Sequence, residues 1–193
     1  MNRTTILSPT VASLAIIRDN ACAPPGAAIR HVAVFVASIA SCGKHRFRIK
    51  TQDFVGSEDG RDVTDWLGST IPPGADIALR PASSMLDPSL STDLEEPSPW
   101  WPIADMAWLR QRFGEEPRIY TLNLSNSDIS ETARGMGLPC AMPDDPWQVR
   151  AAHGASEAQA IWCHLQALTC SDDETAYRID AWKAWISAGQ SQR

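Results

Sequence analysis

The feature that most constrains the fold is an apolar run at residues 31–40, HVAVFVASIA. β-Branched and aromatic residues are frequent in it, and it is too short to cross a membrane as a helix. The run therefore predicts a buried β-strand. Because its odd and even positions are both apolar, the strand belongs in a sheet that is covered on both faces. The two expected sets are Val32, Val34 and Val36 on one face and Ala33, Phe35 and Ala37 on the other.

The segments that follow predict an α/β domain. Residues 45–51, HRFRIKT, alternate polar and apolar side chains after a turn, as the second strand of a hairpin does. In the helix predicted at 61–70, Val63, Trp66 and Leu67 recur at helical spacing. Strands are also predicted at 75–79 and 118–124, helices at 103–113, 127–135, 156–169 and 173–188, and an irregular Pro-rich segment at 80–102. Such an alternation of strands and helices is typical of α/β folds.

The length of 193 residues and a hydrophobic content of 44% fit one globular domain. We expect an N-terminal extension over residues 1–30, a single domain over 31–188 and a polar tail over 189–193. Within the extension, residues 6–17 are partly apolar, as in a signal peptide, but Pro9 and Ser13 interrupt the run. A short helix or strand that packs on the domain is the favoured interpretation.

Charge and cysteine usage narrow the environment of the chain. The net charge is −6, so no overall positive field attracts nucleic acid, although a local basic groove is compatible with it. The cysteine count of 5 is odd and includes no CxxC pair, which predicts reduced thiols in a cytoplasmic protein. No stretch reaches the length of a membrane span. There is no Gly-x-Ser-x-Gly elbow or phosphate-binding glycine loop, and nothing specifies an oligomeric state.

The most specific motif lies in residues 136–170, MGLPCAMPDDPWQVRAAHGASEAQAIWCHLQALTC. Gly-Leu-Pro at 137–139 ends a helix, and a short Pro/Asp loop follows that closes with Trp-Gln-Val at 147–149. The amphipathic helix after it holds IWCHLQALT at 161–169. This order resembles the C-terminal part of the DEDD superfamily of 3′–5′ exonucleases, most of all the bacterial group related to the proofreading domain of B-type DNA polymerases. The resemblance implies an RNase H-like mixed β-sheet flanked by α-helices.

In that family four carboxylates hold two divalent ions, Mg²⁺ or Mn²⁺, which activate water and stabilise the leaving oxygen. The resemblance places Val36 and Ser38 at the Asp-x-Glu of the first strand. It places Trp162 at the water-orienting Tyr and Gln166 at the last metal-binding Asp. Asp87 alone keeps a carboxylate, and an ordinary Asp-Pro turn explains it equally well. Because the other side chains cannot replace carboxylate ligands, the sequence predicts a degenerate domain without activity and without a metal cofactor.

Three other hypotheses stay open. His153 and Glu157 resemble a second branch of the superfamily, whose helix carries a His and then an Asp, but here the spacing is shorter and Glu replaces Asp. An active metal-dependent 3′–5′ exonuclease with displaced ligands is the second alternative. A structural subunit of a replication, phage or mobile-element assembly is the third.

The expected role is that of an inactive exonuclease-like domain that binds single-stranded nucleic acid or a protein partner. Lys44, Arg46 and Arg48, followed by Lys50, alternate along the predicted strand and would share one face. A solvated sheet edge or a contact to a nucleic-acid backbone explains them. Trp162 is expected to fill the space of metals and a terminal nucleotide beside Val36, with Gln166 bonded to backbone or water. Alternatively, Trp162 is open to solvent and stacks a base.

Overall fold

The computed structural model describes residues 9–18, 29–40, 43–54, 61–80, 119–122, 124–142 and 144–190. Its centre is a five-stranded sheet in the order β3-β2-β1-β4-β5. The strands are β1 (Thr10–Arg18), β2 (Ile29–Ile39), β3 (His45–Asp53), β4 (Asp76–Leu79) and β5 (Ile119–Thr121). Strand β2 is antiparallel to β1 and β3, whereas β4 is parallel to β1 and β5. The α/β class and the mixed sheet are therefore as predicted.

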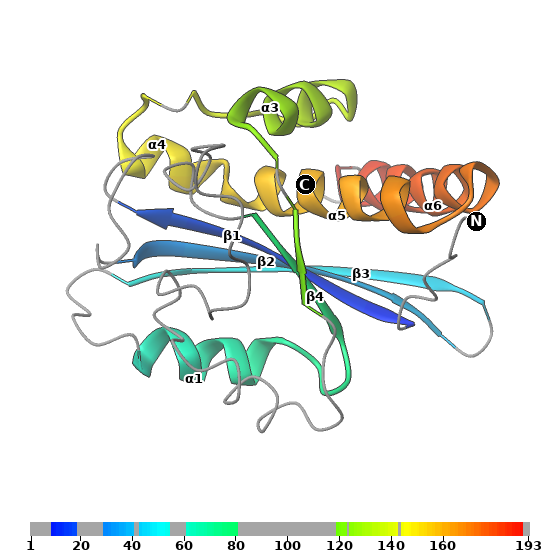
Figure 1. Ribbon diagram of the computed structural model, residues 1–193, viewed down its shortest axis with the longest axis horizontal. Coiled ribbons are helices and arrows are strands. Elements are labelled where there is room, and N and C mark those ends of the chain that lie inside the picture. Colours follow the sequence, from blue (N-terminus) through cyan, green and yellow to red (C-terminus); the bar gives the residue numbers. More distant parts are fainter. Residues whose placement is uncertain are drawn as a thin grey trace, which may run out of the picture.

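Helices cover both faces of the sheet (Figure 1). One face carries α1 (Arg61–Thr70), and the other carries α3 (Asn126–Gly135), α4 (Trp147–Ala152), α5 (Gly154–Thr169) and α6 (Asp172–Gln190). The predicted helices at 61–70, 156–169 and 173–188 are confirmed within two residues at each end. The residues predicted as helix 103–113, and the irregular segment after Arg80, lie outside the described part of the chain.

Two sequence predictions about chain segments are wrong in detail. The sequence predicts a loop at residues 147–149, but they form part of α4, because Pro146, with a φ of −53°, starts a helical turn and accepts a hydrogen bond from the amide of Arg150. The polar tail is expected from residue 189, but α6 continues to Gln190.

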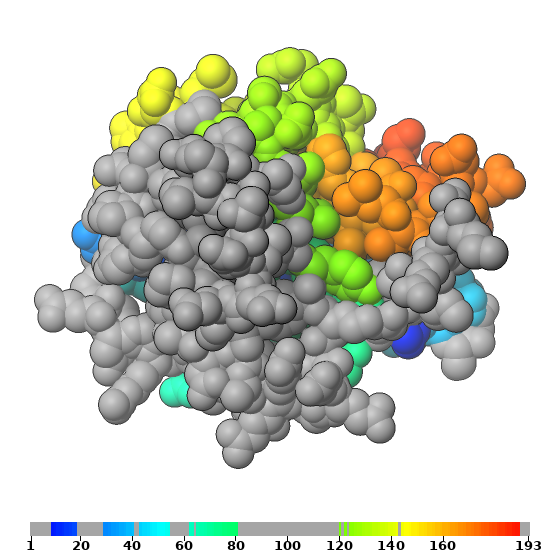
Figure 2. Space-filling model, viewed as in Figure 1, coloured from blue at the N-terminus to red at the C-terminus, as the bar shows by residue number. Residues whose placement is uncertain are grey.

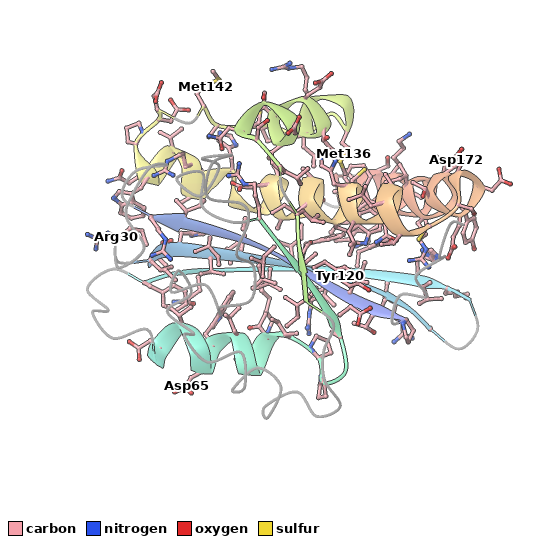
Figure 3. The ribbon with its side chains drawn as sticks, in the orientation of Figure 1. Arg30, Asp65, Tyr120, Met136, Met142 and Asp172 are labelled. Carbon is pink, nitrogen blue, oxygen red and sulfur yellow. The ribbon has the colours of Figure 1, made fainter. Side chains whose placement is uncertain are left out.

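Strand β2 is buried on both faces, as its sequence predicts. Val32, Val34 and Val36 pack in the apolar cluster beneath the sheet with α1, and all three are at most 5% exposed. The alternating set Ala33, Phe35 and Ala37 packs in the cluster above the sheet with α5 and α6. In Figure 3 the side chains fill the space between the sheet and the helices on either side. The prediction of a covered central strand is confirmed.

The start of the domain lies earlier than expected. The sequence predicts an extension over residues 1–30, but β1 lies in the middle of the sheet between β2 and β4. Its apolar residues face both clusters, so a segment that reads as an interrupted apolar run is instead a strand buried on both sides. Ser13, the polar interruption, is fully buried and donates its hydroxyl to the carbonyl of Ala158 in α5, at 2.6 Å. That hydrogen bond offsets the cost of burying the hydroxyl.

Helix α5 lies close against β1 and β2 in its first two turns, where small residues are buried. Ala158 is fully buried. A Cβ on Gly154 would lie 3.1 Å from the His31 ring and 3.2 Å from Ile17. The neighbouring α6 is joined to α5 by a buried hydrogen bond from the Trp182 indole to the Gln159 side chain, at 2.8 Å. In the space-filling view, atoms of α3, α5 and α6 lie along the upper part of the molecule (Figure 2).

None of the described helices combines the length and apolar character that a membrane crossing requires. The cysteines in the described part of the chain form no disulfide. The free thiols are those of Cys140, Cys163 and Cys170. Cys22 and Cys42 lie outside the described residues. Burial raises the pKa of the Cys163 thiol, which disfavours the nucleophilic thiolate form.

Candidate functional site

Trp162 is part of the core. It is 2% exposed, and its ring meets Phe35 edge-on at a centroid distance of 5.4 Å and Phe47 at 5.8 Å. These contacts combine area burial with the favourable edge-to-face geometry of aromatic pairs. The ring therefore has no free face on which a base could stack, so the alternative interpretation of Trp162 as an exposed platform is wrong. The expectation that it fills interior space agrees with its burial.

Gln166, one helical turn after Trp162, is fully buried and bonded to a cation. Its Oε1 accepts a hydrogen bond from Nη1 of Arg178 in α6, at 2.7 Å, and a longer one from the Cys170 thiol. The sequence predicts backbone or water as the partner, and the actual partner is a guanidinium. Because Arg178 is already positively charged, a metal cation near Gln166 would be repelled.

The sequence predicts Val36 beside Trp162, with Val36 and Ser38 at the positions of the family's first two carboxylates. The structure places Val36 on the opposite face of the sheet, in the cluster that contains α1. Alternation along β2 turns Phe35 toward Trp162, so the expected contact with Val36 is wrong by one residue. Ser38 lines a small pocket that Trp162 also lines. Neither β1, TVASLAIIR, nor β2, IRHVAVFVASI, contains a carboxylate.

Carboxylates do not converge in the described part of the chain. Asp87 lies outside it, and no group of three His, Cys, Asp or Glu side chains within it could hold a metal ion. In the second-branch pair, Glu157 bonds to Arg80 at 2.9 Å, and His153 stands at the N-cap of α5. Arg80 bonds further to Asn126, so this polar group joins the end of β4 to α3 and α5.

The basic side chains form a row along β3. Arg46, Arg48 and Lys50 are exposed, whereas the intervening Phe47 and Ile49 pack against the core on the α5 side. Lys44 is exposed in the turn just before the strand. The prediction that these cations share one face is confirmed for the residues within the strand. We call Arg46, Arg48 and Lys50 the β3 basic row.

The β3 basic row lies on an edge strand of the described sheet, on the face that α1 partly covers. Strand β3 pairs with β2 and is the terminal strand in the order of the described sheet. Arg48 donates to the carbonyl of Thr70 at the end of α1, at 2.7 Å, which fixes its position. Cations near a helix C-terminus are also favoured by the helix dipole. The row can therefore offer Arg46 and Lys50 to an anion without breaking a hydrogen bond seen in the structure.

The sequence pattern does not identify Arg178 as the partner of Gln166. It lies in α6, outside the motif at 136–170, and no spacing links it to Gln166.

A scan against models of known protein families finds no match for this chain, and a search of curated proteins finds no related sequence.

Proposed function

We propose that this chain is a non-catalytic, exonuclease-like domain of RNase H-like fold that binds single-stranded nucleic acid. The observation that carries the non-catalytic part is the pair at Trp162 and Gln166. It keeps the family's one-turn spacing, yet one side chain is core and the other is bonded to Arg178. The mixed sheet, covered by helices on both faces, supports the RNase H-like fold.

The β3 basic row supports nucleic acid as the partner rather than another protein. In a chain of net charge −6, these side chains place like charges at every second residue of one strand. Basic side chains that neutralise phosphates supply most of the sequence-independent affinity for nucleic acid. The exposed edge of the sheet leaves them accessible to an extended backbone.

Purified protein is expected not to release mononucleotides from DNA or RNA with Mg²⁺ or Mn²⁺, and neither ion should raise its melting temperature. The reason is that the described residues bring no carboxylate cluster together and Arg178 repels a cation at Gln166. Gel analysis of end-labelled oligonucleotides measures the activity, and thermal unfolding measures the binding. Release of mononucleotides that is abolished by Asp87→Ala would instead establish the active exonuclease with displaced ligands.

The double variant Arg46→Gln/Lys50→Gln is expected to weaken binding of a labelled single strand. Because this variant neutralises two phosphates fewer, the slope of log K against log salt should become shallower by about 1.4, at 0.7 for each phosphate. Fluorescence anisotropy at several salt concentrations measures this slope. Arg48 is kept, because its hydrogen bond to Thr70 stabilises the fold.

The matched control is Arg134→Gln/Lys183→Gln, which removes the same charge from exposed positions on α3 and α6. It should leave the affinity and its salt slope unchanged. Equal losses in both double variants would show that overall charge, and not the β3 basic row, governs binding. Absence of binding by the unaltered protein would favour a protein partner.

A further inference from the structure

A small pocket lies where β1 begins, β2 ends and β3 begins, against α6. It is lined by Pro9 and Val11 of the first segment, Ala37, Ser38 and Ile39 of β2, His45 and Phe47 of β3, Trp162 of α5 and Arg178 of α6. Its walls are partly aromatic, and its polar side chains come from three different elements. The interior is narrow enough that only a group of about the size of one water molecule fits fully inside.

The Arg178 side chain in the pocket wall, together with the Gln166 side chain bonded to it behind the wall, has more hydrogen-bond donors than acceptors. Arg178, whose side chain is 12% exposed, donates to Gln166 and to Glu174. Its Nε and the Nε2 of Gln166 are buried donors without a partner among the described residues. Buried N–H groups in native proteins almost always have an acceptor, so two such donors on adjacent side chains indicate that one more acceptor belongs near them.

His45 adds a second nitrogen-bearing side chain to the pocket wall. Its ring packs edge-on against Tyr177 at a centroid distance of 5.1 Å. Burial, and then the charge of Arg178, lower the pKa of His45. An anion in the pocket would oppose both effects, because it would stabilise the imidazolium and shield it from the guanidinium. Glu174, bonded to Arg178 and half exposed, leaves that guanidinium with N–H groups to spare.

We propose that this pocket binds one oxyanion group, a carboxylate or a phosphate, held by Arg178 with His45 and Ser38 as hydrogen-bonding partners. Arg is suited to such a group because its planar fork matches two oxygens at once. Because the interior holds about one water-sized group, one oxygen of the oxyanion would enter it, with the rest of the group and of the molecule outside. The β3 basic row is not part of the pocket, so this site stands or fails independently of nucleic-acid binding along β3.

The test follows the imidazole signals of His45 by NMR in a chloride buffer while inorganic phosphate is added. We expect a saturable shift and a higher pKa for His45 with phosphate than without it. Arg178→Lys and His45→Gln should each weaken phosphate binding at least about tenfold; for His45→Gln, the backbone amides of Ser38 and Phe47 report binding. Since Arg178 also bonds to Gln166, His45→Gln tests the site with the α5–α6 contact intact.

Controls and further ligands complete the experiment. Arg134→Lys, on the exposed side of α3, should bind phosphate as the unaltered protein does. Acetate and oligonucleotides with a 5′-phosphate or a 5′-hydroxyl distinguish the sources, since the tightest ligand identifies whether a carboxylate or a nucleic-acid end is preferred. The proposal is overturned if neither phosphate nor acetate gives a saturable shift, or if both pocket variants bind as tightly as the unaltered protein.

Discussion

Replacing Trp162 by alanine is expected to lower the free energy of unfolding by about 3–5 kcal/mol. The Trp162 side chain extends from the buried side of α5, is 2% exposed and packs against the rings of Phe35 and Phe47. Its removal leaves a cavity lined by large aromatic rings, which cannot collapse without moving β2 or β3. Urea unfolding followed by circular dichroism measures the loss without relying on tryptophan fluorescence.

Leu168→Ala is the matched control for that experiment. Leu168 lies on the same helix but is 70% exposed, so its truncation should change stability by no more than about 0.5 kcal/mol. A loss below about 1 kcal/mol for Trp162→Ala would mean that the ring is not packed against Phe35 and Phe47. In that case Trp162 would again be available to nucleic acid, as a platform on which a base could stack.

The parts of the fold that the sequence predicts are those with a strong local pattern. Residues 31–40 carry apolar side chains in both alternating sets, and α1 carries helical spacing from Val63 to Leu67, so both elements are expected and both are present. β1 has a weaker pattern, because Ser13 interrupts it. The Ser13 hydroxyl donates a hydrogen bond to the carbonyl of Ala158, which is distant in the sequence. No local pattern can reveal this contact.

The candidate site is predictable in composition but not in geometry. Trp162 and Gln166 can be identified as unfit for metal chemistry from their side chains alone. Val36 faces α1 and not Trp162, because alternate residues of β2 point to opposite faces of the sheet. A shift of one residue in the register would exchange the two faces, and the sequence does not specify this register. The pairing of Gln166 with Arg178 depends on how α6 packs beside α5, a tertiary contact outside the motif.

The hydrogen bond between Trp182 and Gln159 is expected to anchor α6 to α5. Both side chains are at most 2% exposed, and the Gln159 amide also donates to the carbonyl of Ala155. In Gln159→Leu the Trp182 indole N–H is left without an acceptor in a buried environment, so we expect a loss of about 1–3 kcal/mol in unfolding free energy. Chemical denaturation of the single variant measures this loss.

A double-mutant cycle separates the hydrogen bond from simple packing. Trp182→Phe removes the donor and leaves the Gln159 oxygen without its indole partner, whereas the variant with both changes leaves neither group unpaired. We therefore expect the double variant to lose less stability than the sum of the single variants, by about 1 kcal/mol or more. Strictly additive losses would show that the indole–amide bond contributes nothing beyond packing. The position of α6 beside α5 would then rest on its other contacts, which include the Arg178–Gln166 hydrogen bond and the apolar packing of Ile179, Trp185 and Ile186.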